Sequence, residues 1–292
     1  MNVFMPYLGE FVGTCLLVLL GDGVVANVIL KKTKGHGSGW IVITVGWATA
    51  VVVPALIFGG NGFTNHFNPA LTLSLALTGQ FALGKALGYV VAQFVGGFLG
   101  AVLVWFMHKD HFAATAMAAV KDNYVAACEG FCSIDEMRQL QADEDKAKAT
   151  YQRNKADSEA TMLAVFCTGP AIRKKWLNFC CEVIATFVLL FALAAGLANA
   201  SNGEELHGAY TLWGVWMVIL ALGMSLGGTT GYSLNPARDL APRLAHQILP
   251  IKGKGKSDWG YAWIPTVGPL VGAILGCIVS IAMFSSFAPV FW

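Results

Sequence analysis

Charged residues are scarce in this chain of 292 residues. They make up 12% of it, beside a hydrophobic fraction of 56%, whereas a soluble globular domain carries about a quarter charged residues. So little charge could not cover the surface of a soluble fold of this size. The same composition excludes a disordered protein, because disorder goes with low hydrophobicity and high charge.

The charge that is present is concentrated in one region. Of the 36 charged residues, 20 lie in 108–177, and the other 222 residues share 16. The sequence has no basic run that would indicate nucleic-acid binding and no alternation typical of outer-membrane strands. Its first apolar segment is too long for a cleavable signal core and contains an acid, Glu10. The composition is therefore that of a helical protein that crosses a membrane several times.

The cysteines do not form a metal-binding pattern. Four of the seven lie in apolar segments and are interpreted as small core residues: Cys15, Cys180, Cys181 and Cys277. The other three lie in the charged region, where their odd number and spacing allow at most one disulfide: Cys128, Cys132 and Cys167. No metal and no cofactor are expected.

Six segments are long enough to cross a bilayer, which takes about 20 residues. They cover approximately 7–30, 40–58, 84–107, 179–198, 209–226 and 261–284. Two further apolar segments, 69–78 and 236–248, would reach only about half-way at 1.5 Å per residue. Each follows the same tripeptide, Asn68-Pro69-Ala70 or Asn235-Pro236-Ala237. Asn is a good helix N-cap and Pro suits the first helical position, so both segments are predicted to be short helices.

The order of segments repeats: two spans, a short helix, one span, and then the same again. Glu10 in the first span corresponds to Glu182 in the fourth, and the pair Gly96 and Gly100 corresponds to Gly272 and Gly276. Three spans per half is an odd number, so the second half must enter the membrane inverted, with a site near the midplane. We predict halves at 1–107 and 178–292, joined by an extramembrane lobe, 108–177, with a polar helix over about 134–160.

Two Asn-Pro-Ala boxes on half-helices in an inverted repeat resemble the major intrinsic protein family, the aquaporins and aquaglyceroporins. The resemblance covers the chain except for a stretch around 123–160. It implies an all-α membrane protein with six transmembrane helices and two re-entrant half-helices. It also implies a homotetramer in the cell membrane, plasma or inner, with cytoplasmic termini. The second box continues as Arg238-Asp239, which is typical of the glycerol-facilitator branch.

The resemblance also implies a selectivity filter, which consists of Trp47, Gly223, Tyr232 and Arg238. Gly223 stands where water-only members usually have His, and Trp47 matches the filter Trp of glycerol channels. Tyr232 stands where Phe is frequent, and it adds a hydroxyl. We expect the missing side chain of Gly223 to make room for the Trp47 and Tyr232 rings.

A polyol that enters a narrow pore loses its water, and each unsatisfied hydroxyl costs several kcal/mol. The loops before the half-helices are expected to be extended and to offer lumen-facing carbonyls: Thr64, Asn65, His66, Gly231, Tyr232 and Ser233. Asn68 and Asn235 would supply donors at the centre, and Arg238 a forked donor further out. The positive half-helix N-termini and Arg238 would repel cations.

Three acids lie inside predicted spans. For Glu10 and Glu182 the resemblance implies a structural role, in which each carboxylate accepts backbone N–H groups of a re-entrant loop; the alternative is proton coupling. Asp22 is interpreted either as a wetted vestibule residue or as the partner of a loop donor. His66, next to the first box, is predicted to be a structural residue bonded to its loop.

The predicted function is a passive channel for glycerol, other small neutral solutes and water, and not an enzyme. Two alternatives remain: a channel mainly for neutral lactic acid, dihydroxyacetone or urea, and an ion-coupled secondary transporter. The transporter would need a titrating or sodium-binding centre, whereas Asn68 and Asn235 are neutral.

The distribution of basic residues conflicts with the implied orientation. The short connections 31–34 and 252–256, which the family places outside, hold most of the lysines beyond the lobe. The positive-inside rule predicts the reverse topology.

Overall fold

The computed structural model describes residues 3–59, 63–118, 134–200 and 207–284, which form helices and no strand. The helices are α1 (Met5–Ile29), α2 (Trp40–Phe58), α3 (Pro69–Leu77), α4 (Leu83–Ala118), α5 (Ile134–Phe166), α6 (Lys175–Ala200), α7 (His207–Ser225), α8 (Pro236–Ile248) and α9 (Ile264–Phe284). The predicted all-α fold is confirmed, and helices occupy all six predicted spans and both predicted half-helices.

Some helix ends differ from the prediction. Helix α4 continues past residue 107 to Ala118, with a break in helical geometry at His108 (φ −110°, ψ 15°). The polar helix α5 extends to Phe166 rather than to residue 160. Within the described ranges, five helices are long and apolar enough to cross a membrane, and α7 adds a shorter apolar stretch, Leu212–Ser225.

The two halves pack in equivalent ways. Helix α1 packs against α4, and α6 packs against α9. A Cβ on Gly96 would lie 2.1 Å from the Phe11 carbonyl oxygen, and one on Gly272 would lie 2.3 Å from that of Val183. Because Phe11 follows Glu10 and Val183 follows Glu182, the same close crossing occurs once in each half. Only glycine lets the two backbones approach this closely.

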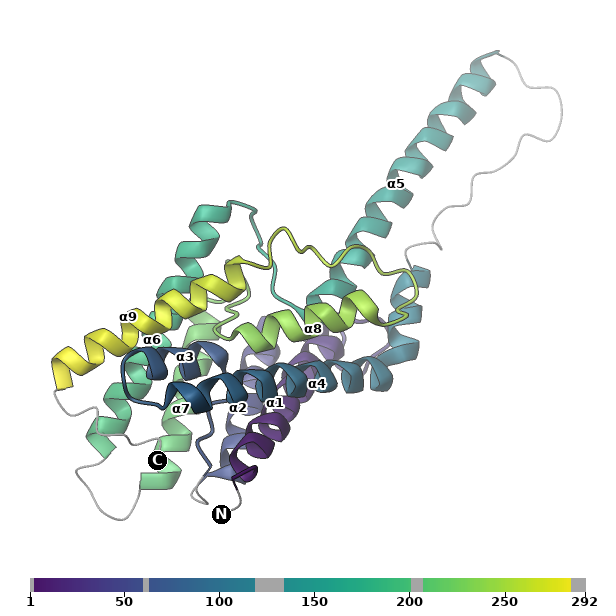
Figure 1. The fold of residues 1–292 in the computed structure, drawn as a ribbon. Coiled ribbons are helices and arrows are strands. Elements are labelled where there is room, and N and C mark those ends of the chain that lie inside the picture. Colours follow the sequence, from purple (N-terminus) through teal and green to yellow (C-terminus); the bar gives the residue numbers. More distant parts are fainter. Residues whose placement is uncertain (1–2, 60–62, 119–133, 201–206, 285–292) are drawn as a thin grey trace.

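The half-helices α3 and α8 lie within the bundle, and both pack against α4 and α9 (Figure 1). Asn68 and Asn235 cap their N-termini, as the tripeptides predict. Because α4 and α9 are the last spans of the two halves, each half-helix is held by the last span of its own half and by that of the other half. Helices α2 and α7 also pack against each other.

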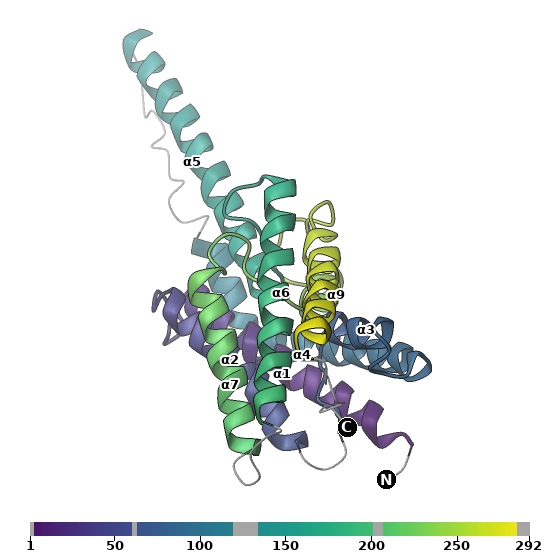
Figure 2. The same cartoon turned by 90° about the vertical axis from the view of Figure 1, so that its left-hand side faces the viewer.

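Helix α5 projects away from the bundle (Figures 1 and 2). Its base is anchored: Phe166 stacks on Phe112 and its ring lies 5.5 Å from that of His246, and Ser158 Oγ donates to the Thr115 carbonyl. Cys167, just beyond this helix, is a buried free thiol. Cys128 and Cys132, the other two cysteines of the charged region, lie outside the described residues.

Candidate functional site

The Glu10 carboxylate gathers the loop before α3. It accepts the backbone N–H groups of His66 and Phe67 at 2.8 and 2.7 Å. Thr64 Oγ1 and Gln93 Nε2 donate to the same carboxylate at 3.2 and 2.7 Å. The buried charge thus satisfies amide groups that would otherwise have no partner at this depth.

The Glu182 carboxylate does the same for the loop before α8. It accepts the backbone N–H groups of Ser233 at 3.1 Å and Leu234 at 3.4 Å, and the hydroxyl of Thr230 at 2.6 Å. The two acids therefore hold equivalent amide pairs in the two halves.

These loops are not extended, and that prediction is wrong. Asn65 and Phe67 have φ values of 55° and 49°, and Tyr232 and Leu234 have values of 36° and 57°. In an extended strand, consecutive N–H groups point to opposite sides, but each glutamate takes two consecutive N–H groups. The backbone must therefore alternate into the left-handed region, which is the geometry of an anion-binding nest.

The same geometry fixes the direction of four carbonyls. In a trans peptide, the C=O of one residue points opposite to the N–H of the next. Because the amides of His66 and Phe67 point at Glu10, the carbonyls of Asn65 and His66 point away from it. The corresponding pair in the second half is Tyr232 and Ser233. All four belong to the predicted set of pore-lining carbonyls.

Asn68 and Asn235 link the two half-helices across the centre. Asn68 Nδ2 donates to the Leu234 carbonyl at 2.9 Å, and Asn235 Nδ2 donates to the Phe67 carbonyl at 2.8 Å. Their Oδ1 atoms accept the amides of Ala70 and Ala237 as N-caps. A side-chain amide carries two N–H bonds, so each asparagine uses one across the interface and keeps a second.

Arg238 lies in the first turn of α8 and contacts Trp47 of α2. Its guanidinium carbon is 3.9 Å from the centroid of the Trp47 ring, a stacked cation–π contact. Both side chains are buried. The structure therefore brings together two predicted filter residues that are 191 positions apart in the chain.

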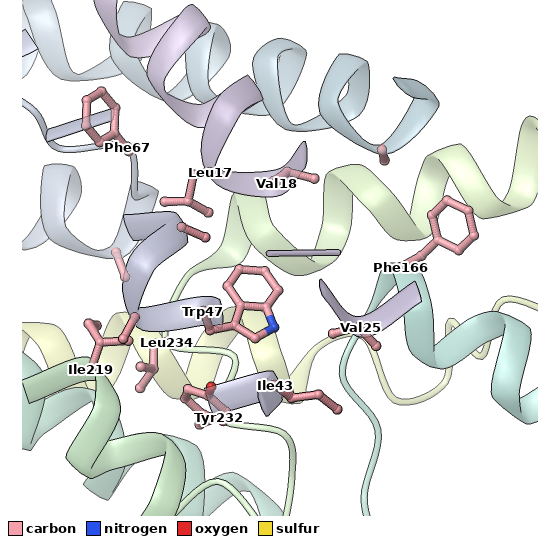
Figure 3. Close-up of a cluster of buried hydrophobic side chains, with 14 of the residues drawn as sticks. Leu17, Val18, Val25, Ile43, Trp47, Phe67, Phe166, Ile219, Tyr232 and Leu234 are labelled. Carbon is pink, nitrogen blue, oxygen red and sulfur yellow. The ribbon is translucent and has the colours of Figure 1, made fainter. Parts of the chain in front are cut away.

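Tyr232 and Gly223 are also adjacent. The Tyr232 hydroxyl would lie 2.8 Å from a Cβ on Gly223. Figure 3 shows the Trp47 and Tyr232 side chains in the same apolar cluster. The four predicted filter residues thus form two contacting pairs, Arg238 with Trp47 and Tyr232 with Gly223.

Sequence reasoning missed Trp40, the first residue of α2. Its Nε1 donates to the Gly223 carbonyl at 3.0 Å, and its ring packs edge-on to Tyr232 at 6.0 Å. A spacing of seven residues places it on the same face of α2 as Trp47, which is a signal that could have identified it.

Asp22 is neither of the two things expected of it. It is fully buried, so it is not a wetted vestibule residue, and its charged neighbour is Arg238 in α8, not a loop donor. His66 is buried and its Nδ1 lies 3.0 Å from Thr72 Oγ1. That contact ties the ring to the first turn of α3.

A second buried network, which the sequence analysis did not predict, holds α8 in place. Asp239 accepts both the backbone N–H and the hydroxyl of Thr168, at 2.8 and 2.6 Å. Arg243 pairs with Asp239 at 2.8 Å and donates to the carbonyls of Thr168 and Ser257. The end of the lobe is thereby joined to the half-helix that carries Arg238.

Comparison with known proteins agrees with this architecture. The chain is 44% identical over 270 residues to a probable glycerol uptake facilitator protein of Thermotoga maritima, covering 92% of this chain and 95% of that protein. It is 42% identical to a glycerol uptake facilitator protein of Streptococcus pneumoniae, covering 93% and 96%.

A solved structure shares the fold. The aquaglyceroporin from Plasmodium falciparum is 24% identical, with a TM-score of 0.69 and coverage of 98% of this chain and 97% of that one. The family profile described as MIP, major intrinsic protein, matches residues 2–141 and 144–280. With this match over nearly its whole length, the chain belongs to the major intrinsic protein family.

Proposed function

We propose that this multi-pass membrane protein is a passive channel for glycerol, other small neutral solutes and water. The observation that carries the proposal is the paired arrangement at the centre, where Asn68 and Asn235 each keep one N–H beyond the bond that joins the half-helices. A neutral polyol needs donors and acceptors along one side of its path, because burying a bare hydroxyl is costly.

The neighbouring groups supply that path. The carbonyls of Asn65, His66, Tyr232 and Ser233 act as acceptors, and Arg238 acts as a forked donor. Trp47 and the ring of Tyr232 provide the apolar wall for the carbon backbone. The names of the bacterial relatives support glycerol as the main permeant.

Cation exclusion follows from the same parts. Each half-helix presents roughly half a positive charge at its N-terminus, and both N-termini lie at the Asn68–Asn235 link. Neutral asparagines at the centre do not titrate, so the proposed channel has no proton- or sodium-coupling site there. Flux is downhill only and involves no covalent step.

The test uses purified protein in liposomes and stopped-flow light scattering. Glycerol, urea, dihydroxyacetone, lactic acid at low pH and water are compared on one vesicle preparation, with and without imposed proton or sodium gradients. We expect glycerol to enter fastest among the solutes and to stop at its outside concentration. Accumulation above that concentration would contradict a channel, and a faster rate for another solute would replace glycerol as the main permeant.

We also propose that the protein assembles as a homotetramer in the cell membrane, as the family pattern implies. Mass measurement of the detergent-solubilised particle tests this directly. A stable monomer in a mild detergent that still conducts after reconstitution would contradict the proposal.

A further inference from the structure

A buried carboxylate lies beside the arginine of the proposed filter. Asp22 of α1 is completely buried, and its Oδ1 is 3.8 Å from Nη1 of Arg238, itself only 8% exposed. Among the residues that the structure describes, no donor lies within hydrogen-bond distance of either Asp22 oxygen. No other cation in the described ranges pairs with it. Its close electrostatic partner is therefore Arg238.

Two consecutive residues of α1, Gly21 and Asp22, form part of the surroundings of Arg238. A Cβ on Gly21 would lie 2.2 Å from the Trp47 ring, so glycine lets that ring pack against α1. The Trp47 ring in turn contacts the Arg238 guanidinium. Gly21 thus admits the ring that stacks on the cation, and Asp22 supplies the opposite charge.

We infer that Asp22 is the counter-ion of Arg238 and a positioning residue of the filter, so that the filter has no net charge. The inference rests on the proposed channel function. It assigns discrimination between cations and anions to the balance of these two residues and not to Arg238 alone.

Removing Asp22 and removing Arg238 should change the ion selectivity in opposite directions. Opposite charges about 4 Å apart interact strongly away from bulk water, and deleting one leaves the other uncompensated. Asp22→Asn leaves the Arg238 cation above the positive half-helix ends, which favours anions. Arg238→Val leaves the Asp22 anion and opens space, which favours cations. The double variant removes both charges and restores neutrality.

The experiment measures ion conductance and reversal potential in planar bilayers under a potassium chloride gradient. We expect the wild type and the Asp22→Asn/Arg238→Val double variant to be ion-tight. Each single variant should leak at least roughly tenfold above that level, and the two should give reversal potentials of opposite sign. Asp22→Glu keeps the charge and should stay tight.

The matched control is Thr14→Val, because Thr14 is a buried polar residue of the same helix that bonds to the Glu10 carbonyl and carries no charge. It should leave ion conductance at the wild-type level. An Asp22→Asn protein that is ion-tight, or that leaks cations like Arg238→Val, would overturn the inference.

Should Asp22→Asn fail to yield folded protein, the comparison of Arg238→Val with the double variant decides. The cation leak of Arg238→Val must disappear when Asp22 is also removed, and its persistence would overturn the inference. Failure of the wild type to conduct glycerol would refute the proposed function. Water permeability and reversal potentials would then still test the counter-ion.

Discussion

The hydroxyl of Tyr232 lies directly against Gly223, so that a Cβ on the glycine would come within 2.8 Å of it and within 2.9 Å of Thr44 Cγ2. A tyrosine of this size fits only because residue 223 has no side chain. The pair couples the ring that lines the proposed filter to a helix of the surrounding bundle.

Filling that space should reduce glycerol flux more than water flux. Overpacking a rigid site costs about 1–3 kcal/mol, and the same cost added to the permeation barrier would lower the rate roughly 5- to 150-fold. We expect Gly223→His to lower glycerol permeability by that order and to spare water, which needs less width. Gly223→Ala should act in the same direction and more weakly. Stopped-flow rates for both permeants on one preparation give the ratio.

Gly214, on the same helix, is the control. A Cβ there would have nothing within 4 Å, so Gly214→Ala should leave the glycerol-to-water ratio unchanged. A folded Gly223→His protein with the wild-type ratio would show that Gly223 does not border the permeation path.

Replacing either buried glutamate should weaken the fold. Glu10→Gln keeps one acceptor oxygen and places an NH₂ group against backbone N–H donors. We expect a loss of about 3 kcal/mol in the free energy of unfolding. Glu182→Gln should cost less, because its contact with Leu234 is longer, at 3.4 Å. Tryptophan fluorescence during denaturant titration in detergent measures both, and an unchanged midpoint for Glu10→Gln would contradict the assigned role.

Arg243→Lys should be far from conservative. The guanidinium contacts Asp239 and three backbone carbonyls, those of Thr168, Ser257 and Asp258, and an ammonium group cannot match that fork. We expect the free energy of unfolding to fall by about 1–3 kcal/mol, because lysine keeps the charge beside Asp239 but leaves buried carbonyls without a donor. Arg173→Lys is the matched control, because Arg173 forms an exposed pair with Asp258 and should cost below about 1 kcal/mol. Equal losses in the two variants would refute the special role of the buried network.

The orientation conflict becomes smaller in the structure. Lys254 Nζ donates to the carbonyls of His246, Gln247 and Leu249 at the C-terminus of α8. That lysine neutralises a helix end and is not a free loop charge, so the charge count overstates the case against cytoplasmic termini.

We therefore expect the loop after α8 to face outward. In an otherwise cysteine-free variant, Lys252→Cys should react with a membrane-impermeant maleimide applied to intact cells. Cytoplasmic termini would place the start of α4 on the inner side, so a cysteine at Lys85, near that start, should react only after permeabilisation. The reverse pattern would establish the opposite topology.

Much of the helix arrangement could be predicted from the sequence, because short-range interactions set where helices begin. The Asn-Pro-Ala tripeptides predict where α3 and α8 begin because capping and the fixed φ of proline act over a few residues. The pairing of Gly96 with Gly272 follows from the repeat, and each glycine does lie against the helix that carries the matching glutamate. The resemblance also selected filter residues that the fold brings into contact.

Only the tertiary structure decided the rest. The loop backbone leaves the extended region because two consecutive amides must both bind one glutamate on another helix. The loop sequence alone does not indicate this long-range contact. Asp22 has Arg238 as its partner because α1 and α8, which are far apart in the sequence, pack together in the fold. The roles of three further residues also depend on contacts with distant parts of the chain: Trp40, Thr168 and Arg243. Helix ends are set by neighbouring residues, whereas the partner of a buried charge is set by which helices pack together.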